Sequence, residues 1–560
     1  MYRETRTAEN GAAPNLIGLM MDRPLLISSI LEHAQRWNAA VEIVTREGDG
    51  SISRSTYGEL AARTARLAHA LRAYGIAPGE RVGTFAWNSQ RHLELYYGVS
   101  GIGAVVHTVN PRLFAEQIEY IVNHARDRIV FVDADLVGIL EPLASRLETV
   151  ELYVVLGGHA GTPHTSLPNA VNYEAFIAGW PDSIAWPAFD ERTASSLCYT
   201  SGTTGNPKGA LYSHRSTVLH ALSGAAAHRT RKGAISCVLP VVPMFHANAW
   251  GLPYVAPMVG AKLVMPGPRL DPASLYELFE HEAVDFTAGV PTVWLWLLAY
   301  LKAGGLKFTT LAALGVGGSA SPRAMIEAFE NDYGVEVLQG WGMTETSPVC
   351  TTGAIKAKHD TENERIAYKA LAGRCNFGAD MRLVDEDGRD LPFDGVAQGE
   401  LLVRGHWVVS AYFEDEAATG RAFTEDGWFR TGDIASLDAD GYLTMRDRTK
   451  DVIKSGGEWI SSIDLENVAA GHPDVAEAAA IGVPHPTWAE RPILAIGKKP
   501  ETAPTRESVL AFLEGKIAKW WMPDDVVFVE DLPHTATGKV SKRLLRERFG
   551  TYRLPAPSAR

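Results

Sequence analysis

The stretch YTSGTTGNPKG, residues 199–209, is the part of the sequence best suited to bind an anion. It combines three glycines, a row of hydroxyl side chains and Lys208. Glycines let the backbone approach an anion closely, and exposed N–H groups and hydroxyls bind phosphate oxygens. The Walker A pattern G-x-x-x-x-G-K-[ST] is absent. Because residues 210–213 look like a strand, we predict a strand–loop–strand phosphate-binding loop; the alternative is a flexible surface hairpin.

Two carboxylates lie in turns that could bring them to a ligand. Glu345 follows Thr344 in GWGMTETSP, and a hard cation prefers such oxygen ligands. The alternative is a capping pair at a helix N-terminus. Asp433, in RTGD, is suited to accept hydrogen bonds from paired hydroxyl groups. The alternative is that Asp433 is only a turn residue between two strands.

His246 and Trp250 lie four residues apart in an apolar stretch. A single histidine in such surroundings is more often a core residue than a functional one. Residues 241–257 and 289–298 are equally apolar, and they are candidates for the walls of an apolar pocket or for ordinary core.

The C-terminal fifth of the chain carries lysines beside glycines. Lys539 follows Gly538 just before a predicted basic helix, where a surface lysine is the alternative. Lys454 precedes Gly456 and Gly457, and a charged linker with a glycine turn is the alternative there.

Composition limits the class of protein. The chain has 560 residues with 53 Lys and Arg against 66 Asp and Glu, a net charge of −13. General nucleic-acid binding is disfavoured because it needs a basic surface. The four cysteines are widely spaced, which argues against a zinc site or a disulfide framework. No apolar window approaches the roughly 20 residues of a membrane span, and no secretory signal begins the chain, so we expect a soluble cytoplasmic protein.

The order of predicted elements indicates an α/β protein with a second, smaller module. Short strands at 81–86, 128–132 and 152–156 alternate with helices, as in parallel sheets. From about residue 378, short strands joined by Asp-Gly turns predict an antiparallel barrel or sheet. From 451 the pattern is α+β, with strands at 476–483, 493–497 and 526–529 and helices at 508–521 and 539–549. We therefore expect a large α/β region at 1–446 with a β-barrel-like part at about 378–446, a hinge at 447–452 and a mobile α+β domain at 453–560.

Several strings in fixed order resemble the acyl-adenylate-forming enzymes, which include acyl-CoA synthetases, aryl-CoA ligases, firefly luciferase and peptide-synthetase adenylation domains. They are YTSGTTGNPKG, PMFHANAWGLPY, GWGMTETSP, RTGD, DRTKDVIKSGGEWI and TGKVSK. The resemblance covers about residues 25–550. Within the family it is densest to bacterial medium- and long-chain fatty acyl-CoA synthetases.

The resemblance implies a role for each matching residue in binding the nucleotide. Lys539 would bridge the substrate carboxylate and the α-phosphate, and Thr204 and Glu345 would hold Mg²⁺. Asp433 would bind the ribose, and Arg448 the ribose or phosphate. The remaining positions would contact the phosphates or wall the adenine: Thr200, Ser201, Gly202, Thr203, Gly205, Lys208, Gly318, Ser319, Ala320, Gly340, Trp341, Gly342 and Thr344.

It also implies roles in binding the acid and the thiol. His246, Trp250 and Gly289 would line the acyl pocket, with His246 beside the reacting carboxylate and Trp250 gating a tunnel. Lys450 would be the hinge about which the C-terminal module moves. In a second pose, Lys454 would face the active site and Gly456, Gly457 and Trp459 would border the pantetheine chain.

These residues predict an ATP-dependent carboxylate–CoA ligase that forms acyl-AMP and then acyl-CoA from medium- or long-chain fatty acids. ATP, Mg²⁺ and CoA would be its ligands, and analogy with relatives implies a homodimer. The alternatives are an aryl- or arylalkanoate-CoA ligase, an enzyme that delivers the acyl group to a carrier protein, and a luciferase-like oxidising enzyme.

Overall fold

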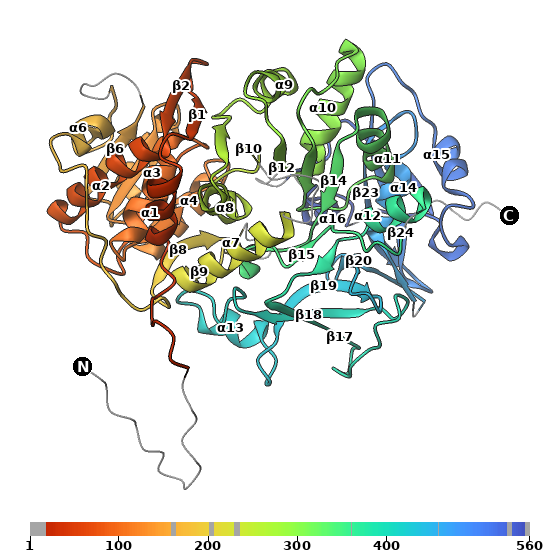
Figure 1. The fold of residues 1–560 in the computed structure, drawn as a ribbon. Coiled ribbons are helices and arrows are strands. Elements are labelled where there is room, and N and C mark those ends of the chain that lie inside the picture. The colour runs from red at the N-terminus through yellow and green to blue at the C-terminus, as the bar shows by residue number, and fades with distance from the viewer. Residues whose placement is uncertain are drawn as a thin grey trace, which may run out of the picture.

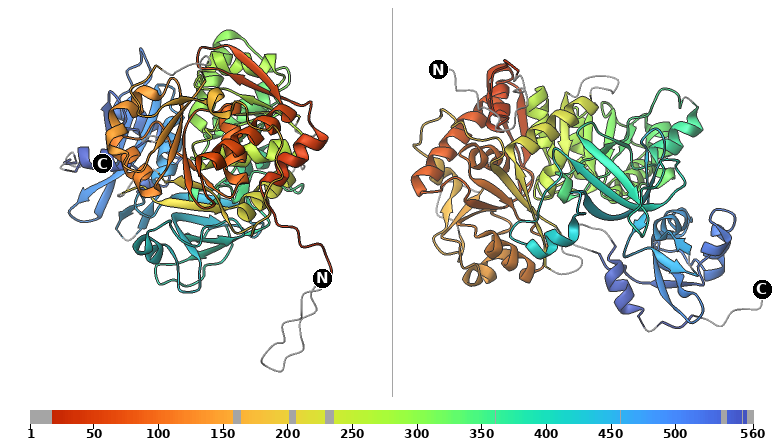
Figure 2. Two further views of the ribbon diagram at one scale, coloured as in Figure 1. Left: turned by 90° about the vertical axis from the view of Figure 1, so that its left-hand side faces the viewer. Right: turned by 90° about the horizontal axis from the view of Figure 1, so that it is seen from below.

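The computed structural model of the protein describes residues 18–157, 164–200, 206–228, 236–359, 361–456, 458–534, 540–550 and 552–554. Two seven-stranded sheets with helices around them form a large body. An antiparallel sheet lies against this body, and the C-terminal segment forms a separate module beside it (Figures 1 and 2). The predicted α/β class is confirmed.

The first large sheet has the strand order β7-β6-β5-β3-β4-β8-β9, and only its edge strand β9 is antiparallel to its neighbour. Its strands are β3 (Arg81–Phe85), β4 (Val105–Thr108), β5 (Ile129–Asp133), β6 (Leu152–Leu156), β7 (Val171–Asn172), β8 (Ala194–Tyr199) and β9 (Gly209–Ser213). The helices in this part are α2 (Tyr57–Tyr74), α3 (Gln90–Gly101), α4 (Ala115–Ala125), α5 (Val137–Leu140) and α6 (Tyr173–Ile177). Thr56 and Glu59 cap α2 reciprocally, and Gly75 ends it in the left-handed conformation.

The second large sheet has the order β14-β13-β12-β10-β11-β1-β2, with only β2 antiparallel. Its strands are β1 (Glu42–Arg46), β2 (Ile52–Thr56), β10 (Cys237–Pro240), β11 (Lys262–Met265), β12 (Phe286–Gly289), β13 (Ala313–Val316) and β14 (Glu336–Gln339). The helices around it are α1 (Ser28–Trp37), α7 (His214–His228), α8 (Leu252–Val259), α9 (Pro272–His281), α10 (Pro291–Gly304), α11 (Arg323–Glu327) and α12 (Glu362–Lys369).

The predicted barrel-like part is an antiparallel sheet of four strands in the order β17-β18-β19-β20. Its strands are β17 (Ala379–Val384), β18 (Gly399–Gly405), β19 (Phe429–Leu437) and β20 (Leu443–Arg448), with helix α13 (Glu416–Ala422) between β18 and β19. A separate pair is formed by β15 (Thr351–Thr352) and β16 (Arg374–Cys375). β17 and β20 are the two edge strands of this sheet. Of the two forms expected, a barrel or a sheet, the structure therefore has the open sheet.

The C-terminal module has a five-stranded sheet and three helices. They are β21 (Ile453–Ser455), β22 (Glu458–Ile460), β23 (Val475–His485), β24 (Ala489–Lys498), β25 (Asp525–Val529), α14 (Ser462–Ala470), α15 (Arg506–Leu513) and α16 (Lys542–Arg548). The predicted helix at 508–521 is wrong in its second half. The helix ends at Leu513 because Gly515 adopts a φ of 73°, and only a short 3₁₀ turn follows at Lys519–Trp521.

The turn between β20 and β21 lies where the hinge is predicted. The module's domain limits and its mobility remain predictions. All four cysteines are free thiols, in accord with their spacing. Within the described part of the chain, no helix combines the length and apolar character needed to cross a membrane.

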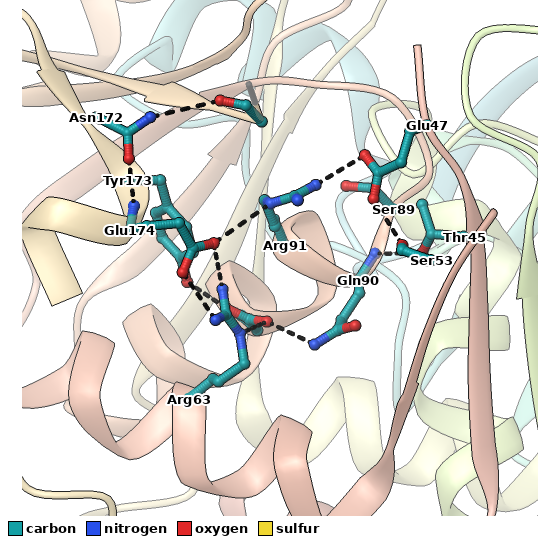
Figure 3. Close-up of polar contacts among 12 residues, drawn as sticks. Thr45, Glu47, Ser53, Arg63, Ser89, Gln90, Arg91, Asn172, Tyr173 and Glu174 are labelled. Carbon is teal, nitrogen blue, oxygen red and sulfur yellow. Dashed lines mark hydrogen bonds and ion pairs between the residues drawn. The ribbon is translucent and has the colours of Figure 1, made fainter. Parts of the chain in front are cut away.

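A network of buried charges joins α2, α3 and α6 at the N-terminal end of the body (Figure 3). Arg63 donates to Glu94, at 2.7 Å, and to Glu174 through both terminal nitrogens, at 2.8 and 2.9 Å. Arg91 continues the network from Glu174 to Glu47. Glu94 is fully buried and also accepts from the Tyr173 hydroxyl. The network therefore depends on one carboxylate that has no contact with water.

We predict that Glu94→Ala lowers the free energy of unfolding by about 3 kcal/mol, because Arg63 would lose one of its two carboxylate partners and the buried Tyr173 hydroxyl would lose its acceptor. Chemical denaturation measures this change. Glu327→Ala is the control, since Glu327 pairs with Arg323 on the exposed surface of α11, where such a pair contributes at most about 1 kcal/mol. Equal losses in the two variants would contradict the importance of burial.

Candidate functional site

One cavity of about 1970 Å³ lies between the large body, the antiparallel sheet and the C-terminal module. Sixteen of the predicted site residues line it. They are Thr200, Lys208, His246, Trp250, Gly289, Gly318, Ser319, Ala320, Gly340, Trp341, Gly342, Thr344, Glu345, Asp433, Arg448 and Lys450. Residues from seven separate stretches of sequence are therefore brought together.

The other predicted positions divide into two groups. Lys454 and Gly456 are described but are not among the residues that line the cavity. Seven positions lie outside the described residues, as does the side chain of Trp459. The seven are Ser201, Gly202, Thr203, Thr204, Gly205, Gly457 and Lys539.

The two strands predicted on either side of the phosphate-binding loop are confirmed, while residues 201–205 between them lie outside the described residues. β8 and β9 pair antiparallel, with Tyr199 opposite Gly209. Just beyond this pair, the Thr200 N–H donates to the Lys208 carbonyl at 2.9 Å, and the Lys208 N–H donates to Thr200 Oγ1 at 3.2 Å. These reciprocal bonds fix the two ends of the loop at the cavity wall.

Glu345 and Thr344 form a short buried 3₁₀ turn, Thr344–Thr346, and not the start of a long helix. The Tyr412 hydroxyl donates to Glu345 Oε1 at 2.7 Å, and the Tyr212 hydroxyl donates to the Thr344 carbonyl at 2.5 Å. Lys208 Nζ lies 4.9 Å from the centre of the Tyr412 ring. Burial raises the pKa of Glu345, so a cation beside this carboxylate would favour its ionised form.

Asp433 is also buried, and two side chains engage its carboxylate. It lies opposite Arg448 across β19 and β20, with 2.7 Å between Arg448 Nε and Asp433 Oδ1. The Trp341 indole N–H donates to Asp433 Oδ2 at 2.9 Å. Trp341 therefore does more than present an aromatic wall, because it also orients the predicted ribose-binding carboxylate. Sequence reasoning did not foresee this bond.

Glycine is required beside Trp341 for close packing. A Cβ atom on Gly342 would lie 2.0 Å from the carbonyl oxygen of Pro348, and one on Gly340 would lie 2.7 Å from that of Thr351. The segment 340–342 can therefore lie against the following chain only because it has no side chain at these two positions.

The segment with His246 and Trp250 has an unusual backbone. Residues 247–251 all have positive φ, from 43° at Ala247 to 83° at Gly251. Four of them are not glycine, and the left-handed conformation costs such residues about 1–2 kcal/mol each. The Trp250 ring packs toward Gly317, where an added Cβ would lie 3.0 Å from the indole.

Two buried asparagines that the sequence analysis missed hold this segment. Asn248 donates to Ser196 Oγ in β8 at 2.9 Å, and its Oδ1 lies 3.2 Å from the Tyr96 hydroxyl. Asn88 donates to the carbonyls of Pro240 and Val242 at 2.8 and 3.0 Å and accepts from the Met244 N–H. An asparagine inside an apolar stretch was the available signal, because asparagine tolerates the left-handed conformation better than most residues.

The C-terminal module contributes one of its two lysine-bearing segments to the cavity. His534 and Val540, which flank the undescribed residues 535–539, both line it. Lys454 instead lies on the exposed surface, 3.3 Å from Glu386 Oε1. Gly456 has a φ of 63° and packs against Trp488 and Trp520, whose ring atoms would lie 3.0 and 3.1 Å from an added Cβ. Neither tryptophan was identified from sequence.

Comparison with known proteins identifies the class. The profile of the AMP-binding enzyme family matches residues 30–413, and that of the AMP-binding enzyme C-terminal domain matches residues 464–539. The chain belongs to the AMP-binding enzyme family, so the predicted resemblance is confirmed. An anthranilate CoA ligase crystallised with anthranoyl-AMP shares the fold, with a TM-score of 0.83 at 24% identity over 95% of this chain and 98% of that one.

Three relatives are similar over nearly their whole length. A 3-methylmercaptopropionyl-CoA ligase of Ruegeria lacuscaerulensis is 49% identical over 95% of this chain and 99% of the relative. A medium-chain-fatty-acid–CoA ligase of Ectopseudomonas oleovorans is 46% identical over 97% and 100%. A long-chain-fatty-acid–CoA ligase of Thermus thermophilus is 47% identical over 95% and 97%. These relatives support the predicted enzyme class, an AMP-forming acid–thiol ligase.

We predict that Asn248→Ala costs more stability than Asn248→Gly. Both variants lose the amide's hydrogen bonds, about 1–2 kcal/mol, but only alanine adds the left-handed penalty of about 1 kcal/mol. Chemical denaturation of both variants measures the difference.

Asn331 is the control, because it is exposed in a right-handed helical turn. There the order should reverse, since glycine is the poorer helix former by about 1 kcal/mol. If alanine is also the better residue at position 248, the turn is not left-handed in solution.

Proposed function

We propose that the protein is an ATP-dependent carboxylate–CoA ligase. The observation that carries this proposal is the single cavity, in which the ends of a phosphate loop, a buried carboxylate and an apolar segment with a histidine meet. A substrate carboxylate oxygen would attack the α-phosphorus of ATP, and pyrophosphate would leave. The CoA sulfur would then attack the acyl carbon of the adenylate as its proton is lost, and AMP would leave.

The first step requires cations, because the reacting carboxylate and ATP are both anions. Lys208 is held at the end of the phosphate loop, and Arg448 reaches the buried Asp433. Lys539 would add a charge at the reacting oxygens, since its neighbour Val540 lines the cavity. Positive charge placed where the transition state gains negative charge accelerates such a reaction.

Mg²⁺ fits the donors around the turn at 344–346. Glu345 is a buried carboxylate whose pKa is raised by burial, and a nearby cation would offset that effect. Mg²⁺ commonly takes one or two protein carboxylates together with substrate phosphates. Glu345 and Thr204 would hold it. When bound, the ion would neutralise charge on the departing pyrophosphate.

Medium- or long-chain fatty acids are the proposed substrates. Apolar side chains from 241–257 and from the start of α10 line the cavity beside His246, among them Val242, Phe245 and Val293. The named activities of two of the relatives support this class. A second candidate is a short thioether acid, which the 3-methylmercaptopropionyl-CoA ligase supports. A methylene group changes binding by only about 1–3 kcal/mol, so residue types alone do not select between these acids.

The second step would use another pose of the C-terminal module. We propose that residues 453–560 turn about Lys450, so that Lys454 and the Gly456 turn replace the segment around Lys539 at the cavity. The surface position of Lys454 supports this, because a residue predicted to act at the site lies outside it in the present pose. We also propose a homodimer in the cytoplasm, which rests on the resemblance.

The first experiment measures AMP release with Mg²⁺ and ATP across alkyl, thioether and aryl acids, each with and without CoA. We expect CoA-dependent turnover with a maximum at an alkyl chain. A maximum at an aryl acid would reject the fatty-acid proposal. Adenylate that CoA never discharges would reject CoA as the acceptor.

We predict that Gly456→Leu lowers acyl-CoA formation about 100-fold or more and leaves acid-dependent ATP–pyrophosphate exchange within about twofold. The new side chain would meet Trp488 and Trp520 where the CoA arm is proposed to pass, and a misplaced reactant can cost about that factor. Both half-reactions are followed by product chromatography and isotope exchange.

Gly515→Leu is the matched control. Gly515 lies in the same module with a φ of 73°, and an added Cβ would meet nothing within 4 Å. It therefore introduces the same kind of backbone strain without the collision. Normal acyl-CoA formation by Gly456→Leu would remove the Gly456 turn from the proposed thiol path.

A further inference from the structure

A compact group of charges lies where the C-terminal module meets the strand that precedes the hinge. Lys542 in α16 pairs with Glu466 in α14, with 2.8 Å between Nζ and Oε1, and it also contacts the Ser462 hydroxyl. Asp447 in β20 accepts the Ser462 N–H at 2.6 Å. The side chains of Asp447, Lys542 and Glu466 are 1%, 12% and 20% exposed, so water screens them little.

The charges in this group depend on one another. Burial alone would lower the pKa of Lys542, but the carboxylates of Glu466 and Asp447 raise it above its usual value. Burial raises the pKa of both carboxylates, and the charge of Lys542 opposes that effect. Lys542 is thus the positive charge that most opposes the effect of burial on the pKa of these two carboxylates.

The hinge divides the group unequally. Lys542, Glu466 and Ser462 all follow the predicted hinge, so their mutual contacts would travel with the module. Asp447 precedes Lys450, the proposed pivot, and its hydrogen bond with the Ser462 N–H would have to break when the module turns. A further contact crosses the same boundary, from the Ser461 hydroxyl to the Arg446 carbonyl.

Lys542 also lies at the base of the loop that carries Lys539. The Ser541 N–H donates to the Pro533 carbonyl at 2.6 Å, and His534 pairs with Val540 as an isolated bridge. These contacts bring Pro533 and His534 beside Val540 and Ser541, the two residues that directly follow Lys539. Lys542 is therefore anchored to Glu466 and Ser462 two residues after Val540, which lines the cavity.

We propose that Lys542 is a positioning residue for adenylation. With Asp447 it forms a latch that holds the C-terminal module in the pose described here and must open before the thiol step. This inference rests on the proposed two-step function. It assigns Lys542 no contact with either substrate.

The test is Lys542→Met, which keeps the length and apolar stem but removes the charge. Two reactions are measured: acid-dependent ATP–pyrophosphate exchange, and acyl-CoA formation from supplied acyl-AMP and CoA. We expect exchange to fall about 30-fold or more, because Asp447 loses the nearby positive charge only in this pose, whereas Glu466 loses its partner in both poses. Transfer from supplied acyl-AMP should stay within about twofold or become faster.

Arg548→Met is the matched control, since Arg548 lies in the same helix but is exposed and is not among the residues that line the cavity. It should leave both reactions unchanged. Asp447→Asn, on the other side of the pivot, should also slow exchange and leave transfer from supplied acyl-AMP within about twofold. It replaces Lys542→Met if that variant fails to fold. Trypsin should cleave near Arg448 and Lys450 faster in both latch variants than in the wild type, because an open latch exposes the turn.

Equal losses in both reactions would overturn the proposal and make Lys542 a merely structural residue. Unchanged exchange would overturn it as well. Failure of the proposed function is a different result, because the unmodified protein itself would then lack acid-dependent exchange.

Discussion

Two anions must meet in one cavity, and this constraint explains most of the site. A carboxylate and a triphosphate repel each other, and the repulsion is strongest where water is excluded. The protein meets it with cations carried on separate elements, such as Lys208 after the phosphate loop and Arg448 on β20. Buried carboxylates then hold these cations or their aromatic neighbours in place. Asp433 fixes Arg448, and Glu345 is bonded to Tyr412, over which Lys208 lies.

The apolar side of the cavity depends on a different device. The segment after β10 leaves regular structure and turns left-handed over Ala247–Gly251, which carries Trp250 with it. Such a backbone persists only where its surroundings over-determine it. Asn88 and Asn248 supply that determination. Asn88 bonds to the backbone of the residues before the turn, and Asn248, inside the turn, bonds to β8. The acyl segment is therefore anchored to the strand that carries the phosphate loop.

Sequence predicted the parts of this protein that are governed by local rules. Strand β6 was placed at its observed limits, and the capping pair of α2 was read from the spacing of Thr56 and Glu59. The cavity residues were found because several short strings resembled one family. The bond from Trp341 to Asp433 and the role of Asn248 were missed, because each depends on contacts between residues far apart in the chain. The end of α15 was misjudged because one glycine outweighed an apolar pattern.

The position of the C-terminal module follows from the same electrostatic constraint. Both of its lysine-bearing segments are predicted to act at one cavity, yet Lys454 lies on the outer surface while the neighbours of Lys539 line the wall. If both segments act there, the module has to exchange poses, as proposed above. Any second pose has to solvate Asp447 or give it a new partner, because a buried carboxylate that loses Lys542 is costly. The free energy of the Asp447 carboxylate in each pose therefore affects how readily thioester formation follows adenylation.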